Sequence, residues 1–354
     1  MSLEVKRIIP SIDNRYVNIV INPDKNIIPR LSDTIFNEDL TIPVLDNPSE
    51  WFCSIVRFVC PLDTIPDVIF PLDIFQNNPN VSLLTIGIKT ALNAYFPQRV
   101  IYVPTNPNIS PPVAGGSSPF FTDEQAGAEY YFIYSITAFL NMINTALAAA
   151  VTASAIGAPS PFFTFNPITE LFSLEVSAAF IATNAEIFIN QYTLNYLKSF
   201  NYRANQVNKV PDPNGADYTF IFPTGAGPFT ILEDYISLPL WFELRKILIT
   251  SNSLPIVQEI VPSGSGVTGV TSSINIITDF AVTFDQSSQI DTVAIYNPTA
   301  QYRLVNMTSN SPLVKMQFQF YWESKQGEVY PLKLSPMQQA SLKIGFFKKN
   351  LYLK

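Results

Sequence analysis

Histidine is absent from the chain. Because histidine is the commonest general base and the commonest zinc ligand, Ser–His and Cys–His nucleophilic pairs and most metal sites are excluded. Only carboxylates remain for catalysis. Glu233 with Asp234, and Asp285 with Asp291, have the chemistry of a glycosidase pair or a calcium site, but neither pair has a motif around it. We interpret all four as solvated acids and predict no catalytic residue, no cofactor, no metal and no enzymatic activity.

Charge is scarce as well. Only 14% of the residues are charged, against about 25% in an average soluble domain. A protein with so little charge usually covers much of its surface with neighbours, which favours a permanent assembly over a free monomer. The net charge is −7 and no basic run is longer than a pair. Direct binding of nucleic acid, which needs clustered Lys and Arg, is therefore not expected.

The chain has only two cysteines, Cys53 and Cys60. They lie seven residues apart in one predicted strand, and an odd spacing places their side chains on opposite faces, too far apart for a disulfide. We interpret both as buried thiols, which fits a reducing compartment or a virus assembled in one. The first 15 residues include charged side chains and lack a long apolar core, so no signal peptide is expected.

What the sequence does contain is alternation of apolar and polar residues, most regularly from Val314 to Phe347. A period of two is typical of a half-buried β-strand. Turn signals at residues 323–328 and at Ser335-Pro336 divide the stretch, and the alternation resumes after each. We predict three strands of one antiparallel sheet here. The expected core positions of the first strand are Val314, Met316, Phe318, Phe320 and Trp322.

Short apolar segments bounded by Pro, Asn or Asp recur along the chain and favour a sandwich or barrel over βαβ units. We also expect a hairpin around Asn166-Pro167 and a short amphipathic helix near Leu194–Phe200. The predicted strands are Tyr16–Ile21, Trp51–Cys60, Val68–Phe70, Val81–Lys89, Phe162–Phe165, Leu171–Leu174, Ile187–Ile189, Trp241–Ile249 and Ile274–Phe284.

The middle of the chain has a different character. After the proline-rich stretch 104–119, Thr122–Gln125 matches a capping box and predicts a helix that runs to about Ser154. No charged residue occurs between Tyr130 and Thr169, so a membrane span is an alternative. Interspersed Ser, Thr and Asn, a weakly hydrophobic alanine run and the lack of flanking Lys or Arg favour a helix buried in a domain core or an interface.

Two further features have a functional and a structural interpretation. Gly264–Gly269 satisfies the dinucleotide pattern G-x-G-x-x-G, but the pyrophosphate needs a helix N-terminus after it, and the segment from Ser272 to Phe284 predicts a strand. We interpret the glycines as a loop. The 27 Phe and 16 Tyr are candidates for sugar-binding platforms, yet phenylalanines that alternate within strands are more often core.

Together these patterns predict an all-β fold, a single jelly-roll β-sandwich with a large α+β insertion domain. The expected boundaries are 1–104 and 236–354 for the two parts of the jelly roll and 105–235 for the insertion with its long apolar helix. An insertion that enters and leaves through loops costs little, because loop closure entropy grows only with the logarithm of length.

Three segments carry a resemblance to a known family: FFTFNPITELFSL at Phe162–Leu174, PLWFELRKILITSNSLPIVQEI at Pro239–Ile260, and FQFYWESKQGEVYPLKLSPMQQASLKIGFFKK at Phe318–Lys349. The chain resembles the penton, or minor capsid, proteins of Polinton-like viruses and virophages, distant relatives of the adenovirus penton base. The resemblance implies a virion protein, assembled in the host cytoplasm or nucleus, with one jelly roll in the capsid wall and five copies at each icosahedral vertex.

The resemblance also implies partners. These are the other copies of a homopentamer, a neighbouring major capsid protein of the double jelly-roll type, and a fibre or host receptor on the outward-facing insertion. The chain lacks the Arg-Gly-Asp tripeptide, so receptor attachment by that route is unsupported.

Two alternatives from other classes remain. One is a lectin-like, receptor-binding head of a viral fibre, which would usually be a trimer. The other is a viral protein anchored in a membrane through Tyr130–Ala155, which would depend on detergent. Oligomeric state separates the first alternative from the pentamer, and partitioning into bilayers separates the second.

Overall fold

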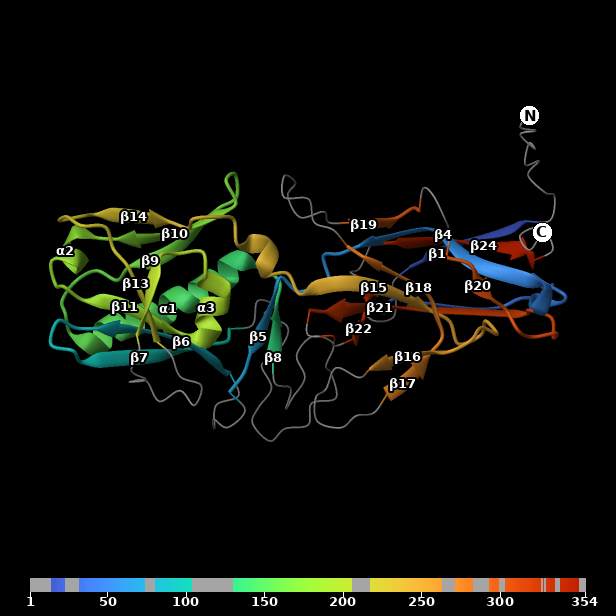
Figure 1. Cartoon of the computed structure of the whole chain (residues 1–354), viewed down its shortest axis with the longest axis horizontal. Helices are drawn as coiled ribbons and strands as arrows, with labels where there is room; N and C mark the ends of the chain where they lie inside the picture. The colour runs from blue at the N-terminus through green and yellow to red at the C-terminus, as the bar shows by residue number, and fades with distance from the viewer. Residues whose placement is uncertain are drawn as a thin grey trace, which may run out of the picture. The chain divides into compact units, whose positions relative to one another are not determined.

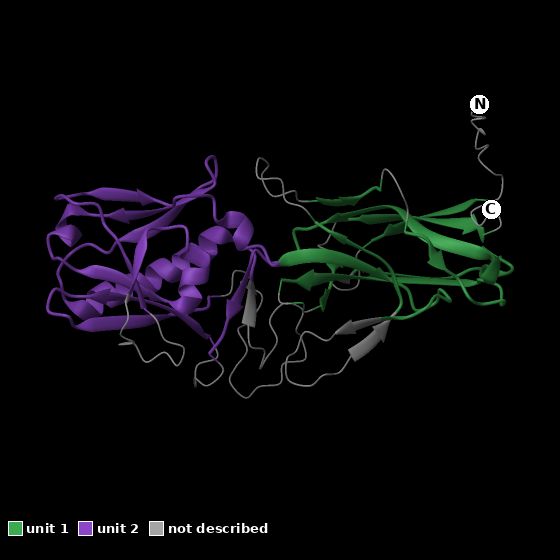
Figure 2. Cartoon of the chain, in the orientation of Figure 1, with its two compact units in different colours: residues 1–65, 244–354 green, residues 66–243 purple. Residues whose placement is uncertain are grey.

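The computed structural model of the chain divides into two compact units (Figure 2). Unit 1 combines Met1–Ile65 with Leu244–Lys354, and unit 2 is Pro66–Glu243. The structure describes residues 14–22, 32–73, 80–103, 130–205, 217–262, 271–282, 293–298, 303–325, 327, 329–334 and 338–349.

Unit 1 is built from two antiparallel sheets (Figure 1). The first has the order β1 (Arg15–Ile21), β24 (Ala340–Lys348), β4 (Trp51–Pro61) and β19 (Val293–Tyr296), and β20 (Val305–Asn306) also pairs with β4. The second has the order β18 (Ile276–Ala281), β15 (Leu244–Thr250), β21 (Lys315–Ser324) and β22 (Val329–Pro331), and β3 (Ile35–Asp39) also pairs with β21.

The core of unit 1 lies between these two sheets, as in a β-sandwich. Phe58 of β4 lies against Phe320 of β21 and Phe280 of β18, with ring centroids 5.0 and 6.1 Å away. The alternation predicted for the C-terminal stretch is confirmed from Met316 to Trp322, whose apolar side chains are buried. Val314, at the start of that stretch, is exposed and precedes the strand.

The three C-terminal strands do not lie in one sheet, and that prediction is wrong. β21 and β22 form the expected hairpin, with Tyr321 opposite Pro331. β24 instead pairs with β1 and β4 in the first sheet. Alternation shows that one face of a strand is buried, but both sheets of a sandwich bury a face against the same core, so the pattern cannot assign a strand to one of them.

Smaller elements complete unit 1. They are the strand pair β2 (Ser32–Asp33) with β23 (Lys333–Leu334), the hairpin β16 (Glu259–Pro262) with β17 (Thr271–Ile274), and the 3-10 turn η1 (Pro48–Glu50). The segment after Gly264–Gly269 is therefore strand, as predicted, while the glycines themselves lie outside the described residues.

Unit 2 contains a five-stranded sheet, a three-stranded sheet and a strand pair. The first has the order β12 (Tyr202–Asn205), β13 (Asp217–Phe220), β11 (Glu186–Asn190), β6 (Val81–Lys89), β7 (Tyr95–Ile101); the second β14 (Phe229–Leu232), β10 (Leu171–Val176), β9 (Phe162–Asn166); the pair is β5 (Val68–Pro71) with β8 (Tyr130–Ile133). The helices are α1 (Ile136–Ser154), α2 (Ala178–Ile181), α3 (Gln191–Leu197) and the 3-10 turn η2 (Leu238–Leu240).

The predicted ends of the insertion differ from the ends of unit 2. The predicted boundary at residue 104 places β5, β6 and β7 in the sandwich, but they belong to unit 2, where β6 pairs with β11 and β5 with β8. Composition changes sharply at Pro104, yet this position lies within unit 2, which begins at Pro66. Short buried strands look alike in sequence, so only long-range pairing reveals which unit holds them.

The start of the long helix also differs from the prediction. α1 begins at Ile136, and the Ser135 hydroxyl caps it by accepting a hydrogen bond from the Ala138 amide at 3.3 Å. Tyr130–Ile133, expected to be helical, form β8 instead. The capping box at Thr122–Gln125 lies outside the described residues. Serine is one of the strongly preferred N-cap residues. Because Ser135 lies within the uncharged segment, it was not recognised as the start of the helix.

Candidate interaction surfaces

Glu233 is a structural carboxylate, so our interpretation of it as a solvated acid is wrong. Its side chain is 4% exposed, and it accepts hydrogen bonds from the Phe172 amide at 3.1 Å and the Ser237 hydroxyl at 2.6 Å. The Ser199 hydroxyl is a third donor. Glu233 therefore ties β10 to the chain that follows β14. Buried charge is tolerated only with such partners.

The other acids singled out in the sequence form no site with Glu233. Asp234 is exposed, as expected for a solvated acid, and Asp285 and Asp291 lie outside the described residues. Across the described ranges, no three Cys, Asp or Glu side chains are grouped so as to hold a metal ion. Cys53 and Cys60 are buried free thiols, as predicted, and burial raises the pKa of each to about 12.

The aromatic side chains at the centre of unit 2 belong to its core. Phe172 and Trp241 stack with centroids 4.3 Å apart, and Phe139 packs edge-on against Trp241 at 5.2 Å. The Trp241 indole donates to the Tyr196 carbonyl, and the Tyr196 hydroxyl donates to the Ile69 carbonyl, each at 2.8 Å. Burial raises the pKa of Tyr196. Rings enclosed in this way cannot serve as sugar-binding platforms.

The uncharged helix α1 passes the length and composition test for a membrane span, the one helix in the described parts of the chain that does. One of its faces packs against β6, β7 and β9. That face is apolar and buried, and includes Phe139, Ile143, Leu147 and Ala150. The opposite face exposes Thr137, Asn141, Thr145 and Ala148. Such a division is typical of a core helix in a folded domain.

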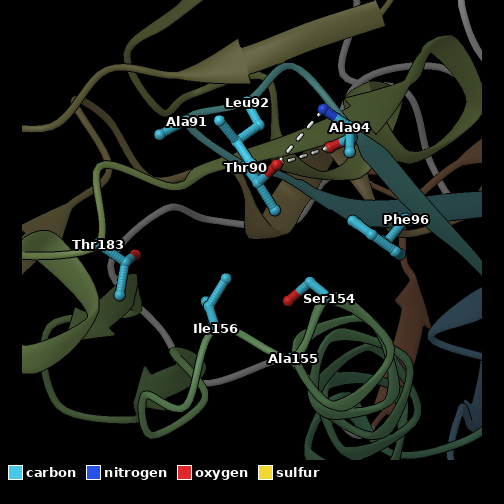
Figure 3. Close-up of a pocket in the computed structure, with 9 residues that line it drawn as sticks. All are labelled: Thr90, Ala91, Leu92, Ala94, Phe96, Ser154, Ala155, Ile156 and Thr183. Atoms are coloured by element: carbon cyan, nitrogen blue, oxygen red, sulfur yellow. Dashed lines mark hydrogen bonds between the residues drawn. The ribbon is translucent and has the colours of Figure 1, made fainter.

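A pocket of about 500 Å³ lies beside the C-terminal end of α1 (Figure 3). The β6–β7 turn forms one wall, where Thr90 exchanges hydrogen bonds with Ala94, and Leu92 at the turn is 91% exposed. Its lining residues carry no charge: Thr90, Ala91, Leu92, Ala94, Phe96, Ser154, Ala155, Ile156 and Thr183. The pocket offers contact area and hydroxyl groups but no general acid or base.

The outer face of the first sheet of unit 1 carries an exposed aliphatic row. Strand register aligns Val20, Ser341, Val59 and Ile295 across β1, β24, β4 and β19. Val20 is 53% and Ile295 is 67% exposed, whereas the neighbouring Ile19 and Ala294 are buried. Because contiguous exposed apolar surface often marks an interaction site, this row is a candidate interaction surface.

This row was missed in the sequence, although a signal for it existed. Trp51–Cys60 is apolar at nearly every position, a pattern that predicts a strand largely buried on both faces. In the structure, Phe58 is buried, Val59 is half-buried and Arg57 is exposed. A strand that is apolar on both faces fits a lone sandwich poorly, and such a pattern also indicates a face that a partner covers.

The outer face of the second sheet has the opposite chemistry. Lys246 lies 3.0 Å from Glu323 and 3.6 Å from Asp279. Arg303 pairs with the same Asp279 at 2.8 Å and with Glu259. These charges neutralise one another within the chain.

The described residues thus provide candidate interaction surfaces and a buried structural carboxylate, Glu233. The family model described as Sputnik minor capsid protein V18/19 matches residues 15–349. This chain belongs to that family. It is therefore a structural protein of a viral capsid. The uncharacterised protein V18 of Sputnik virophage is 34% identical over 157 residues, which are 43% of this chain and 91% of V18.

A second curated relative and two solved structures are also similar to this chain. The structural protein V19 of Sputnik virophage is 25% identical over 210 residues, which are 53% of this chain and 94% of V19. A chain in the 3.5 Å cryo-EM structure of the Sputnik virophage matches with a TM-score of 0.78 and 30% identity, over 97% of this chain and 99% of that one. The mavirus penton protein, at 15% identity and a TM-score of 0.65, shares the fold, over 94% and 98%.

Proposed function

We propose that this capsid protein is a penton protein, five copies of which form a ring that closes each icosahedral vertex of the virion. The observation that carries the proposal is the match of 97% of the chain, at 30% identity, to a chain of the Sputnik virophage structure. The exposed aliphatic row and the low charge support a permanent assembly, because both need a partner to cover apolar surface.

Native mass spectrometry of the purified chain at micromolar concentration tests this proposal. We expect a closed pentamer. A trimer would favour the fibre-head alternative, and a persistent monomer would exclude a penton that assembles by itself. Around such a ring we propose a major capsid protein of the double jelly-roll type as neighbour, and jelly-roll connectivity for the sandwich of unit 1.

We propose that unit 2 is an insertion that folds separately, faces outward and helps to hold the ring together. Its own buried core, with the Phe172–Trp241 stack, supports independent folding. Replacing Pro66–Glu243 by a short Gly-Ser linker should leave a folded sandwich with weakened oligomerisation. A fibre or host receptor that binds unit 2 would lose binding in the same variant. Failure of the remaining sandwich to fold would contradict this organisation.

We propose that the protein has no hydrolase, transferase or redox activity. The absence of histidine in the sequence and the structural role of Glu233 support this proposal. A screen against glycosides is the sharpest challenge, because carboxylate pairs are the only catalytic groups left. Turnover that Glu233→Gln or Asp285→Asn abolished would contradict it.

A further inference from the structure

The first sheet of unit 1 is basic, although the chain as a whole has a net charge of −7. Its strands β1, β24, β4, β19 and β20 contain no Asp or Glu. Their basic residues are Arg15, Arg57, Lys343 and Lys348. A sheet of one sign in an acidic protein suits a partner surface of the opposite sign.

Two of these charges lie directly opposite each other on the outer face. Lys343 of β24 is the register partner of Arg57 of β4, and Asn18 of β1 continues the row. Like charges at directly opposed positions destabilise a sheet. Within the described residues neither side chain forms an ion pair, although the Lys343 ammonium lies 5.0 Å from the centre of the Tyr16 ring. The pair therefore lacks an acidic partner in the described parts of its own chain.

The charged row lies beside the aliphatic row. Register places Val20 two residues along β1 from Asn18, and Val59 two residues along β4 from Arg57. We call Val20, Val59, Ile295, Arg57 and Lys343 the basic face. Its chemistry, an apolar strip next to two cations without an ion pair among the described residues, suits a partner with apolar side chains next to carboxylates.

A surface of that kind exists on the same unit, at strand β3 of the second sheet. Glu38 and Asp39 end this strand, and both are exposed. Ile35 at the other end is 44% exposed, and Ile42, just beyond the strand, is 78% exposed. We call Ile35, Glu38, Asp39 and Ile42 the acidic edge. Lys315 approaches Asp39 to 3.7 Å, but Glu38 has no ion pair among the described residues.

We infer that the basic face of one copy docks on the acidic edge of the next copy of this chain. The inference rests on the proposed ring, because a cyclic assembly joins two different surfaces of the same chain head to tail. Arg57 and Lys343 then face Glu38 and Asp39, and the aliphatic row of one copy covers Ile35 and Ile42 of its neighbour. Matched charges set the register of the junction, and the apolar strip supplies most of its affinity.

Charge reversal tests the junction from both sides. One variant carries Arg57→Glu with Lys343→Glu, and the second carries Glu38→Lys with Asp39→Lys. The first exchanges one opposed like-charged pair for another, so its melting temperature should stay near that of the unchanged chain. Each variant alone should lose the ring, with its population reduced at least about tenfold in native mass spectrometry, because like charges meet at every junction.

Mixing the two variants gives the sharper result. The basic face of the second variant can dock on the acidic edge of the first, and the reversed face of the first can dock on the reversed edge of the second. We therefore expect the mixture to form oligomers that alternate the two variants and that neither variant forms alone. All four substitutions on one chain should restore the ring with exchanged charges. The control is Lys198→Glu, an exposed position of unit 2, which should leave the ring unchanged where Lys343→Glu weakens it.

Each result either supports the junction or overturns it. Rings formed by either double variant at the level of the unchanged chain would overturn it while leaving the penton proposal intact, as would a mixture that stays monomeric. An unchanged chain that forms no ring would overturn the penton proposal and the junction together. One further outcome would overturn the junction. The unchanged chain would retain duplex DNA, and the variant with Arg57 and Lys343 reversed would keep the ring but lose the DNA. The basic face would then bind nucleic acid.

Discussion

Phe58 and Phe320 stack across the two sheets of unit 1, with ring centroids 5.0 Å apart and ring planes 9° from parallel. Phe58 belongs to β4 near the start of the chain and Phe320 to β21 near its end. The contact therefore joins the two segments of unit 1 that Pro66–Glu243 separates in sequence.

Phe320→Ala should destabilise unit 1 strongly. The ring is 2% exposed, and removal of a buried Phe side chain leaves a cavity that costs about 3–5 kcal/mol. Chemical denaturation followed by tryptophan fluorescence measures the loss. Phe162→Ala is the control, because that ring is 48% exposed and should cost well under half as much. Equal effects of the two changes would place the core elsewhere.

A charge introduced into α1 should distinguish a core helix from a membrane span. Ile143→Asp buries an unpaired carboxylate at a position that is fully enclosed, which should cost more than about 3 kcal/mol and unfold unit 2. Thr145→Asp, on the exposed face, should be tolerated. Denaturation and flotation with lipid vesicles are the measurements. A chain that floats with vesicles, and that loses this behaviour in both variants, would support the membrane-anchored alternative.

Glu233→Gln should weaken unit 2 without affecting any catalysis. The change replaces an acceptor of hydrogen bonds from Phe172, Ser199 and Ser237 with an amide that cannot accept at both ends. The expected loss is about 1–3 kcal/mol in the free energy of unfolding. Asp234→Asn, one residue away and exposed, should stay within about 0.5 kcal/mol. A Glu233→Gln chain as stable as the unchanged protein would contradict a structural role for the carboxylate.

The thiols should be inert in the folded protein. Burial raises the pKa of Cys53 and Cys60 from 9.0 to about 12, and the thiolate is the reactive form. A thiol reagent at pH 8 should label neither until denaturant is added. Because the folded pKa values lie above the unfolded ones, their contribution to stability is intact below pH 9 and falls as pH rises from about 9 to 12. Rapid labelling of the native chain would mean that β4 opens readily.

The sequence predicted those elements whose periodic pattern and bounding turn residues lie within one short stretch of chain. Asn166-Pro167 predicted the β9–β10 turn, and the Asn166 side chain accepts from the Ile168 amide at 2.9 Å. Leu194 and Leu197 predicted α3, and both are buried on it. The alternation around Phe318 predicted β21 and its core face. Side chains two residues apart in a strand, or three to four apart in a helix, share a face whatever they pack against. These features could therefore be predicted without the contacts made by distant parts of the chain.

Tertiary structure alone decided which elements belong together. β24 joins β1 and not β21, because strands of either sheet bury the same kind of face. β5 to β7 join unit 2, because their partners β8 and β11 lie there. Glu233 is buried because Ser199 and Ser237 meet it, and no local pattern foretells donors from separate segments. Val20 and Ile295, far apart in sequence, become one exposed row only when β24 and β4 lie between them in register, since pairing across strands is a long-range property.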